Sequence, residues 1–305
     1  MSRFYRFICV FSIVLLLFTS PAQALSTVKE QARAGVFLQS GIEKLLQGNY
    51  QEAIPDFTAA IGLKKDFAAA YSDRCLAYLE LADYKNAIAD CNQAVRFTPD
   101  NLEAYLNRGL AYYRLGKYQQ AIADDNHVIA LKADDFRAYY NRGIARAMLG
   151  NYQQAISDYD LALQNISSSS TLGAADIYND RGLAWFKLSD LSEAIRDFSQ
   201  AIVLNPDDYR AYYNRGCVCG RSGDYSRAIG DFTASIQLNA HNAQAYLNRG
   251  IAYHQIGHEA AAIADLQRAV AYFSQQGATT SYEKTLNLLK NLQQKLSSQL
   301  EIALI

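Results

Sequence analysis

The sequence predicts an all-α superhelix built from about seven stacked helix pairs. Two short motifs recur along the chain: an Asn-Arg-Gly triplet, and a Tyr-x-x-Ala-Ile-x-Asp segment that begins ten residues after the arginine. A fixed period of 20–50 residues indicates stacked supersecondary units and not one globular core. The arginines of the triplet and its variants are 34 residues apart, with one interval of 39, at Arg74, Arg108, Arg142, Arg181, Arg215 and Arg249.

Length and composition agree with such an array. A chain of 305 residues would suggest about two domains, but an array grows by adding units without enlarging a central core. Half of the residues are hydrophobic, which excludes a disordered chain. The net charge of −1 lacks the basic excess that phosphate backbones require, so we expect no nucleic-acid partner.

Residues 1–24 are predicted to form a secretory signal. Two arginines precede an apolar run from Phe7 to Phe18, and Pro21-Ala22-Gln23-Ala24 offers a small-x-small cleavage site. The run is shorter than the ~20 residues that a membrane span needs, although an uncleaved anchor is the alternative. We therefore expect an exported protein in a bacterial periplasm, or in the thylakoid lumen of a photosynthetic cell, with a linker over residues 25–34.

Apolar residues at helical spacing place two helices in each unit. Helices of about a dozen residues are not stable alone in water, so each must bury its apolar stripe against its partner and the neighbouring unit. The serine-rich residues 167–173 are predicted to be a flexible connector, and residues 281–300 a helix that caps the array. The units are predicted at 35–66, 68–100, 102–134, 136–166, 176–207, 210–241 and 243–273, so that the array spans 35–273.

Small residues recur inside the units. Gly109 precedes Ala121 by twelve residues, and four later units repeat this pair. In an antiparallel helix pair we expect the two positions to face each other. Close backbone contact would then outweigh the ~1 kcal/mol penalty of glycine in a helix.

These motifs resemble the tetratricopeptide repeat family. The family's Trp-x₂-Leu-Gly-x₂-Tyr element has its counterpart in Tyr105-x₂-Arg108-Gly109-x₂-Tyr112, with arginine in place of leucine in six units. The Ala-x₃-Phe element is present at Ala194 and Phe198, and the closing proline at Pro206. The resemblance implies a right-handed superhelix whose first helices line a concave face.

Arginines and aspartates recur in register. Arg108 lies within two residues of facing Asp124, or could reach the aspartate of an adjacent unit, and a planar guanidinium matches a carboxylate. Charges that repeat in every unit point to packing more than to a binding site. The expected structural ion pairs are Arg108 with Asp124, Arg142 with Asp158, and Arg215 with Asp231.

The resemblance also places a row of polar side chains on the concave lining. Asparagine amides both donate and accept hydrogen bonds, as an extended peptide requires, and basic residues nearby suit a segment that carries acidic groups. A solvated helix face is the alternative. The predicted groove residues are Asn107, Tyr140, Asn141, Asn179, Tyr213, Asn214, Asn248, Arg137 and Arg210, with Arg114, Lys187 and Arg221 on the same face, and Asp73 and Asp180 where asparagine stands elsewhere.

No motif points to catalysis, a metal or a cofactor. His254 and His258 lack a third ligand, and no nucleophile elbow, phosphate loop or Cys-x-x-Cys occurs. Four cysteines would remain in the exported chain, and an even number invites disulfides. Cys75 and Cys91, however, are placed about one turn out of register, so buried free thiols are expected.

The sequence therefore predicts a non-enzymatic, exported scaffold that binds a protein or peptide segment in its concave groove. Assembly or stabilisation of a protein complex is the expected role, by analogy with the family. A carrier of a small ligand or cofactor in the tyrosine-lined groove is the alternative, and an enzyme a more distant one. The sequence leaves the partner and the oligomeric state open.

Overall fold

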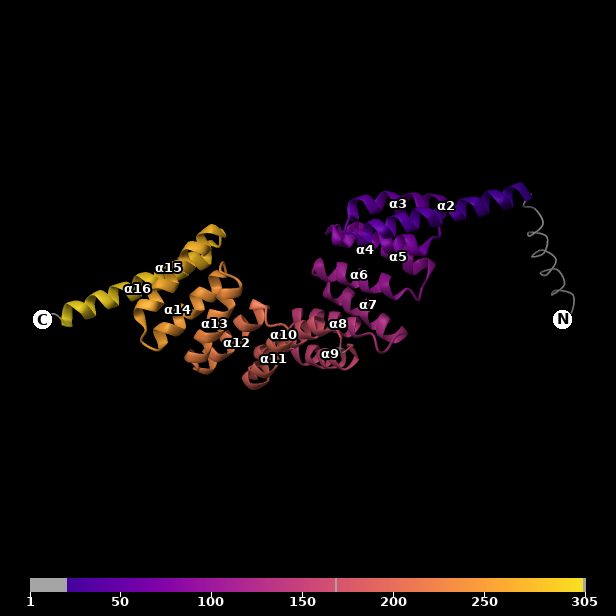
Figure 1. Cartoon of the computed structure of the whole chain (residues 1–305). Helices are drawn as coiled ribbons and strands as arrows, with labels where there is room; N and C mark the ends of the chain where they lie inside the picture. Colours follow the sequence, from indigo (N-terminus) through magenta and orange to yellow (C-terminus); the bar gives the residue numbers. More distant parts are fainter. Residues whose placement is uncertain (1–20, 168, 304–305) are drawn as a thin grey trace. The chain divides into compact units, whose positions relative to one another are not determined.

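The computed structural model describes residues 21–167 and 169–303, and in this part of the chain every regular element is an α-helix (Figure 1). The expected secretory signal lies, except for its last four residues, outside the described part. No helix of that part has both the length and the apolarity needed to cross a bilayer. The helices are α2 (Pro21–Leu46), α3 (Tyr50–Leu63), α4 (Ala68–Glu80), α5 (Tyr84–Phe97), α6 (Leu102–Arg114), α7 (Tyr118–Leu131), α8 (Phe136–Met148), α9 (Tyr152–Asn165), α10 (Thr171–Lys187), α11 (Leu191–Leu204), α12 (Tyr209–Ser222), α13 (Tyr225–Leu238), α14 (Ala243–Gln255), α15 (Glu259–Gln275) and α16 (Thr279–Ala303).

The helices belong to two compact units, each described by itself. The first unit ends at Ala133 and contains α2–α7; the second begins at Asp134 and contains α8–α16. In both units the most extensive contacts join the two helices of one repeat, and each second helix also packs on the first helix of the next repeat of its unit. This arrangement confirms the predicted all-α array, with three helix pairs in the first unit and four in the second.

Each unit has two layers. The first helices of consecutive repeats contact one another, as α4 does α6 and α12 does α14, whereas consecutive second helices make no comparable contacts within the described residues. The first helices therefore form the inner layer of each unit and the second helices the outer layer. Helix α16 packs on α15 and covers the end of the second unit through Leu289 and Leu292.

Two predicted boundaries are wrong. Residues 25–34, expected as a linker, belong to α2, because seven of the ten residues (Leu, Lys, Glu, Gln, Arg and two Ala) have high helix propensity. Helix α10 starts at Thr171, so residues 171–173 of the expected connector are helical. It has 17 residues against 13 in α8, so the insertion adds about one turn of helix.

In the fourth, fifth and sixth repeats the motif glycine makes room for a ring in the facing helix. A Cβ atom on Gly143 would lie 2.6 Å from the ring of Tyr159, and one on Gly216 would lie 2.8 Å from Phe232. The residue opposite the glycine therefore lies sixteen positions later, and not twelve as expected. The alanine twelve positions later comes close in two repeats, where its carbonyl oxygen would lie 3.6 Å from a Cβ on Gly109 and 3.2 Å from one on Gly250.

The second repeat uses this facing position for a disulfide bond. Cys75 and Cys91 are sixteen residues apart and are bonded, with their Cα atoms 5.5 Å apart. The expectation of free thiols is therefore wrong for this pair, because the two helices face each other in a register that the sequence analysis misplaced by about one turn. Cys217, half-buried, and Cys219, buried, are free thiols.

Candidate peptide-binding face

The repeated arginines hold the two helices of each repeat together. In Arg108 the Nε and Nη2 groups donate to the two carboxylate oxygens of Asp124, at 2.9 and 2.6 Å. Arg215 binds Asp231 in the same way, at 2.9 and 2.7 Å. The aspartates are almost fully buried. The same pair, always sixteen residues apart, joins Arg74 to Asp90, Arg142 to Asp158, Arg181 to Asp197, and Arg249 to Asp265.

Within each unit, the remaining guanidinium nitrogen connects a repeat to the one before it. Nη1 of Arg215 donates to the Ser199 hydroxyl at 3.0 Å, and Nη1 of Arg249 donates to the Thr233 hydroxyl at 2.9 Å. Each of these arginines also stacks on the tyrosine three residues earlier, as Arg249 does on Tyr246 at 5.6 Å. Because three helices meet on one guanidinium, these arginines serve packing and offer little to a ligand.

A second set of polar contacts links consecutive first helices of the second unit. The Tyr140 hydroxyl lies 2.8 Å from the Asp180 carboxylate, and the Asn214 amide donates to Asn179 at 2.9 Å. The Asn248 amide donates to the Tyr213 hydroxyl at 3.1 Å. We call these three contacts the polar ladder. Five of the residues predicted to bind a peptide are thus bonded to residues of a neighbouring repeat.

Burial sets the protonation of the Tyr140–Asp180 pair. Asp180 is largely removed from solvent, which raises the pKa of its carboxyl group, while the hydrogen bond from Tyr140 acts in the opposite direction. Burial and the adjacent Asp180 carboxylate raise the pKa of Tyr140, so its hydroxyl stays protonated and donates.

The predicted basic spots differ in how far their charge is compensated. Arg137 pairs with Asp135 at 2.8 Å, and Arg210 pairs with Asp176 at 2.7 Å and with Asp208 at 2.9 Å. Three further cations predicted for this face have no carboxylate partner among the described residues. Arg114 of the first unit and Lys187 of the second are exposed, and Arg221 of the second unit bonds Ser189 and stacks on Phe186. Within the second unit, the uncompensated positive charge of this face therefore lies on repeats 5 and 6.

Three positions of the predicted asparagine row lie outside the polar ladder. Asn107 on α6 and Asn141 on α8 are half-buried. Asp73 on α4 takes the equivalent place in the second repeat, and desolvation raises the pKa of its carboxyl group from 3.8 to about 6. The first unit therefore presents a carboxyl group that titrates near pH 6.

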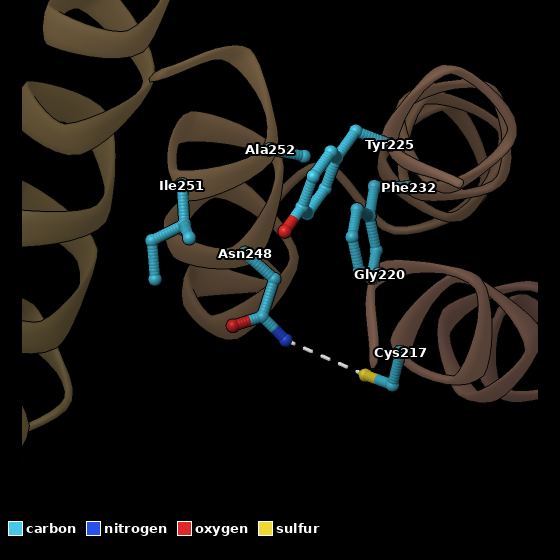
Figure 2. Close-up of a pocket in the computed structure, with 7 residues that line it drawn as sticks. All are labelled: Cys217, Gly220, Tyr225, Phe232, Asn248, Ile251 and Ala252. Carbon is cyan, nitrogen blue, oxygen red and sulfur yellow. Dashed lines mark hydrogen bonds between the residues drawn. The ribbon is translucent and has the colours of Figure 1, made fainter. Parts of the chain in front are cut away.

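A mainly apolar pocket opens between repeats 6 and 7 and was missed by the sequence analysis. Its cavity volume is about 200 Å³, and Figure 2 shows the rings of Tyr225 and Phe232 along one side and Cys217 opposite Asn248. Gly220 of α12 also lines it. An alignment of the repeats could have indicated the pocket, because only the sixth repeat has glycine at this position. The other repeats carry Leu45, Leu79, Tyr113, Ala147, Phe186 and His254.

The described residues contain no cluster of three or more His, Cys, Asp or Glu side chains placed to hold a metal ion. His254 instead pairs with Glu259, 2.8 Å from Nδ1 to the carboxylate. His258, the expected second member of the histidine pair, precedes α15.

The two-layered helix pairs, the 34-residue period and the arginine–aspartate pairs define an α-solenoid of helix-turn-helix repeats. Tetratricopeptide-repeat models match residues 76–116, 106–170, 175–208, 198–230 and 220–278. The chain belongs to the tetratricopeptide repeat family. A comparison with curated proteins finds no match.

Solved structures share this fold at low sequence identity. A tetratricopeptide repeat protein from Parabacteroides merdae superposes with a TM-score of 0.64 at 18% identity, covering 84% of this chain and 99% of that protein. Pseudomonas aeruginosa PilF gives a TM-score of 0.60 at 16% identity, covering 72% and 96%. YrrB, described as a TPR protein with an unusual peptide-binding site, gives 0.51 at 19% identity, covering 64% and 97%.

Proposed function

We propose that this protein is a non-enzymatic, exported scaffold that binds a segment of a partner protein along the first helices of its second unit. The observation that carries the proposal is the combination of Lys187 and Arg221, uncompensated on one face, with the apolar pocket beside Gly220. A surface that offers both suits a peptide with acidic and apolar side chains. Assembly or stabilisation of a protein complex is the role we assign to it, and the peptide-binding site named for YrrB supports the class of ligand.

The polar ladder supports the same function indirectly. Because its residues are tied to one another across repeats, the first helices keep a fixed spacing before any partner arrives. A preformed surface loses less conformational entropy on binding and gains affinity accordingly.

The small-ligand carrier is the weaker alternative. Pockets for drug-sized ligands typically measure about 300–1,000 Å³, whereas the pocket beside Gly220 has about 200 Å³ and is open to solvent. A single side chain of a longer segment fits this space better than a free cofactor does.

Export is proposed on two grounds. The N-terminal sequence has the pattern of a secretory signal, and a disulfide such as Cys75–Cys91 persists in oxidising compartments. In a bacterial host the protein should be released by osmotic shock with the periplasmic fraction. Retention in the cytosolic fraction with all four repeat cysteines as free thiols would contradict export.

Site-specific crosslinking tests the binding face. A photoreactive benzoyl-phenylalanine placed at Lys187, on the inner layer, should crosslink one partner protein in the native envelope. The same group at Arg196 is the control, because that side chain is 73% exposed on α11 of the outer layer. Equal crosslinking from both positions, or none from Lys187, would reject the proposed face.

A further inference from the structure

We propose that the pocket beside Gly220 receives one phenylalanine side chain of the bound segment, and that acidic residues of the same segment face Arg221 and Lys187. This inference rests on the proposed function and names the chemistry of the segment.

The fifth repeat contains its own phenylalanine at the position of Gly220. Phe186 packs against a buried cluster that includes Phe198 and Val218, and Leu183 packs against the same cluster. The residues 34 positions later are Cys217, Phe232 and Ala252, and all three line the pocket. Leu191, also in contact with that cluster, has its counterpart in Tyr225, which forms another wall. The pocket therefore has the same surroundings as the Phe186 ring, but the sixth repeat has glycine, and no ring, at this position.

The size of the pocket agrees with this occupant. An apolar protein cavity of about 150 Å³ is known to hold a benzene molecule, and the pocket measures about 200 Å³. Val218 in the fifth repeat's cluster corresponds to the smaller Ala252 in the pocket, which adds space for a ring that enters from outside.

Gly220 is free of the constraint that fixes the motif glycines. A Cβ atom at Gly220 would meet only the Ala228 Cβ, at 3.9 Å, which is ordinary van der Waals contact. Gly216 in the same helix, by contrast, is required by the Phe232 ring. The fold thus tolerates a side chain at position 220, and its absence leaves the pocket open.

Charge complementarity indicates which residues flank the phenylalanine in the bound segment. Arg221 follows Gly220 directly, and Lys187 takes the equivalent place one repeat earlier. Asp176, a half-buried carboxylate on α10, is already paired with Arg210. Acidic side chains on the repeat-5 side of the phenylalanine would meet both free cations.

A peptide array with the purified full-length protein tests the proposal. Each twelve-residue peptide carries Phe, Leu or Ala at one central position, flanked by either four acidic residues or four lysines. We expect the acidic Phe peptide to bind at least about tenfold more tightly than its Ala counterpart, because burial of a phenyl ring is worth about 1.5–3 kcal/mol and each 1.4 kcal/mol is tenfold in affinity.

Variants of the protein locate the binding. Gly220→Phe should fill the pocket and lower the affinity for the acidic Phe peptide at least about tenfold, while its circular-dichroism melting curve shows an intact fold. Gly230→Phe is the matched control, because Gly230 on α13 faces open space. Lys187→Glu with Arg221→Glu should remove the preference for acidic flanks. Peptide binding should also slow alkylation of Cys217, which lines the pocket.

The contrary outcomes are distinct. Peptide binding that survives Gly220→Phe, or shows no preference for Phe, would overturn the pocket and leave the binding face intact. Absence of any peptide binding would also overturn it, while crosslinking from Lys187 decides the proposed function independently. A change of oligomeric mass in Gly220→Phe, measured by light scattering, would show that a second copy of the chain occupies the pocket and would reject a partner segment.

Discussion

Asn248 donates a hydrogen bond to Tyr213 across the boundary between the sixth and seventh repeats, with 3.1 Å from Nδ2 to Oη. The same amide lies 3.4 Å from the Cys217 sulfur, at the edge of the pocket. One side chain therefore joins two repeats and borders the pocket proposed to receive a phenylalanine.

The Tyr213–Asn248 contact should contribute measurable coupling. We expect Tyr213→Phe and Asn248→Ala each to lower the free energy of unfolding, with a coupling energy of about 1 kcal/mol in a double-mutant cycle. Urea titration followed by circular dichroism measures it. Additive effects of the two substitutions would show that the contact contributes nothing to stability.

Removal of one motif arginine should destabilise the array. Arg215→Ala leaves Asp231 buried without its cation, and we expect a loss of about 3 kcal/mol. Arg221→Ala is the control in the same helix. It removes an exposed hydrogen bond to Ser189 and the stacking on Phe186 but no buried ion pair, so its effect should stay within about 1 kcal/mol. Equal urea midpoints for the two variants would contradict the structural role of the ion pair.

Two glycines of the sixth repeat should respond in opposite directions to alanine. Gly216→Ala places a methyl group 2.8 Å from the buried Phe232 ring, so overpacking should lower stability by about 1–2 kcal/mol. Gly230→Ala meets open space within α13 and should raise stability by up to about 1 kcal/mol through helix propensity. Thermal melting of both variants checks the sign, and Phe232→Leu combined with Gly216→Ala should recover part of the loss.

The carboxyl group of Asp73 should make stability depend on pH. Its pKa is about 6 in the folded chain against 3.8 in the unfolded one, so the folded state holds more protons between these values and stability falls as pH rises through this window. Asp73→Asn should therefore raise the melting temperature at pH 8 and leave it unchanged near pH 3. Asp66→Asn, at an exposed position, is the control and should show no such difference.

The disulfide should stabilise the first unit. Closing a loop of about 15 residues is worth about 3 kcal/mol in the chain-entropy model, and Cys75 and Cys91 are 16 residues apart. We expect dithiothreitol to lower the melting temperature of the native protein and to leave that of a Cys75→Ala/Cys91→Ala variant unchanged. If reductant had no effect on either protein, the bond would be absent in solution.

The repeat pattern was sufficient to predict most of the fold and part of the candidate site. The Arg–Asp register was predictable, because a single spacing of sixteen residues recurs in six repeats. The same spacing, moved by one residue from Arg74 and Asp90, would have identified the Cys75–Cys91 bond. Column-by-column alignment would likewise have singled out Gly220 among larger residues.

The polar ladder was not predictable in this way. Each bond joins the residue two positions before the motif arginine of one repeat to the residue directly before the motif arginine of the next repeat. The bonded residue types differ each time: tyrosine with aspartate, asparagine with asparagine, and tyrosine with asparagine. Only the distance between neighbouring first helices decides that these side chains meet. The sequence therefore predicted that these side chains share one face and contact a ligand, but it could not show that they contact one another.

The Cys75–Cys91 disulfide also affects how far the chain can extend under mechanical force. It joins α4 to α5 within one helix pair, so a protein pulled from its two ends could extend every other pair fully while this hairpin stays closed. Under such a pull, the segment between Cys75 and Cys91 would keep a fixed length. Its release would depend on a reductant and not on the strength of the pull.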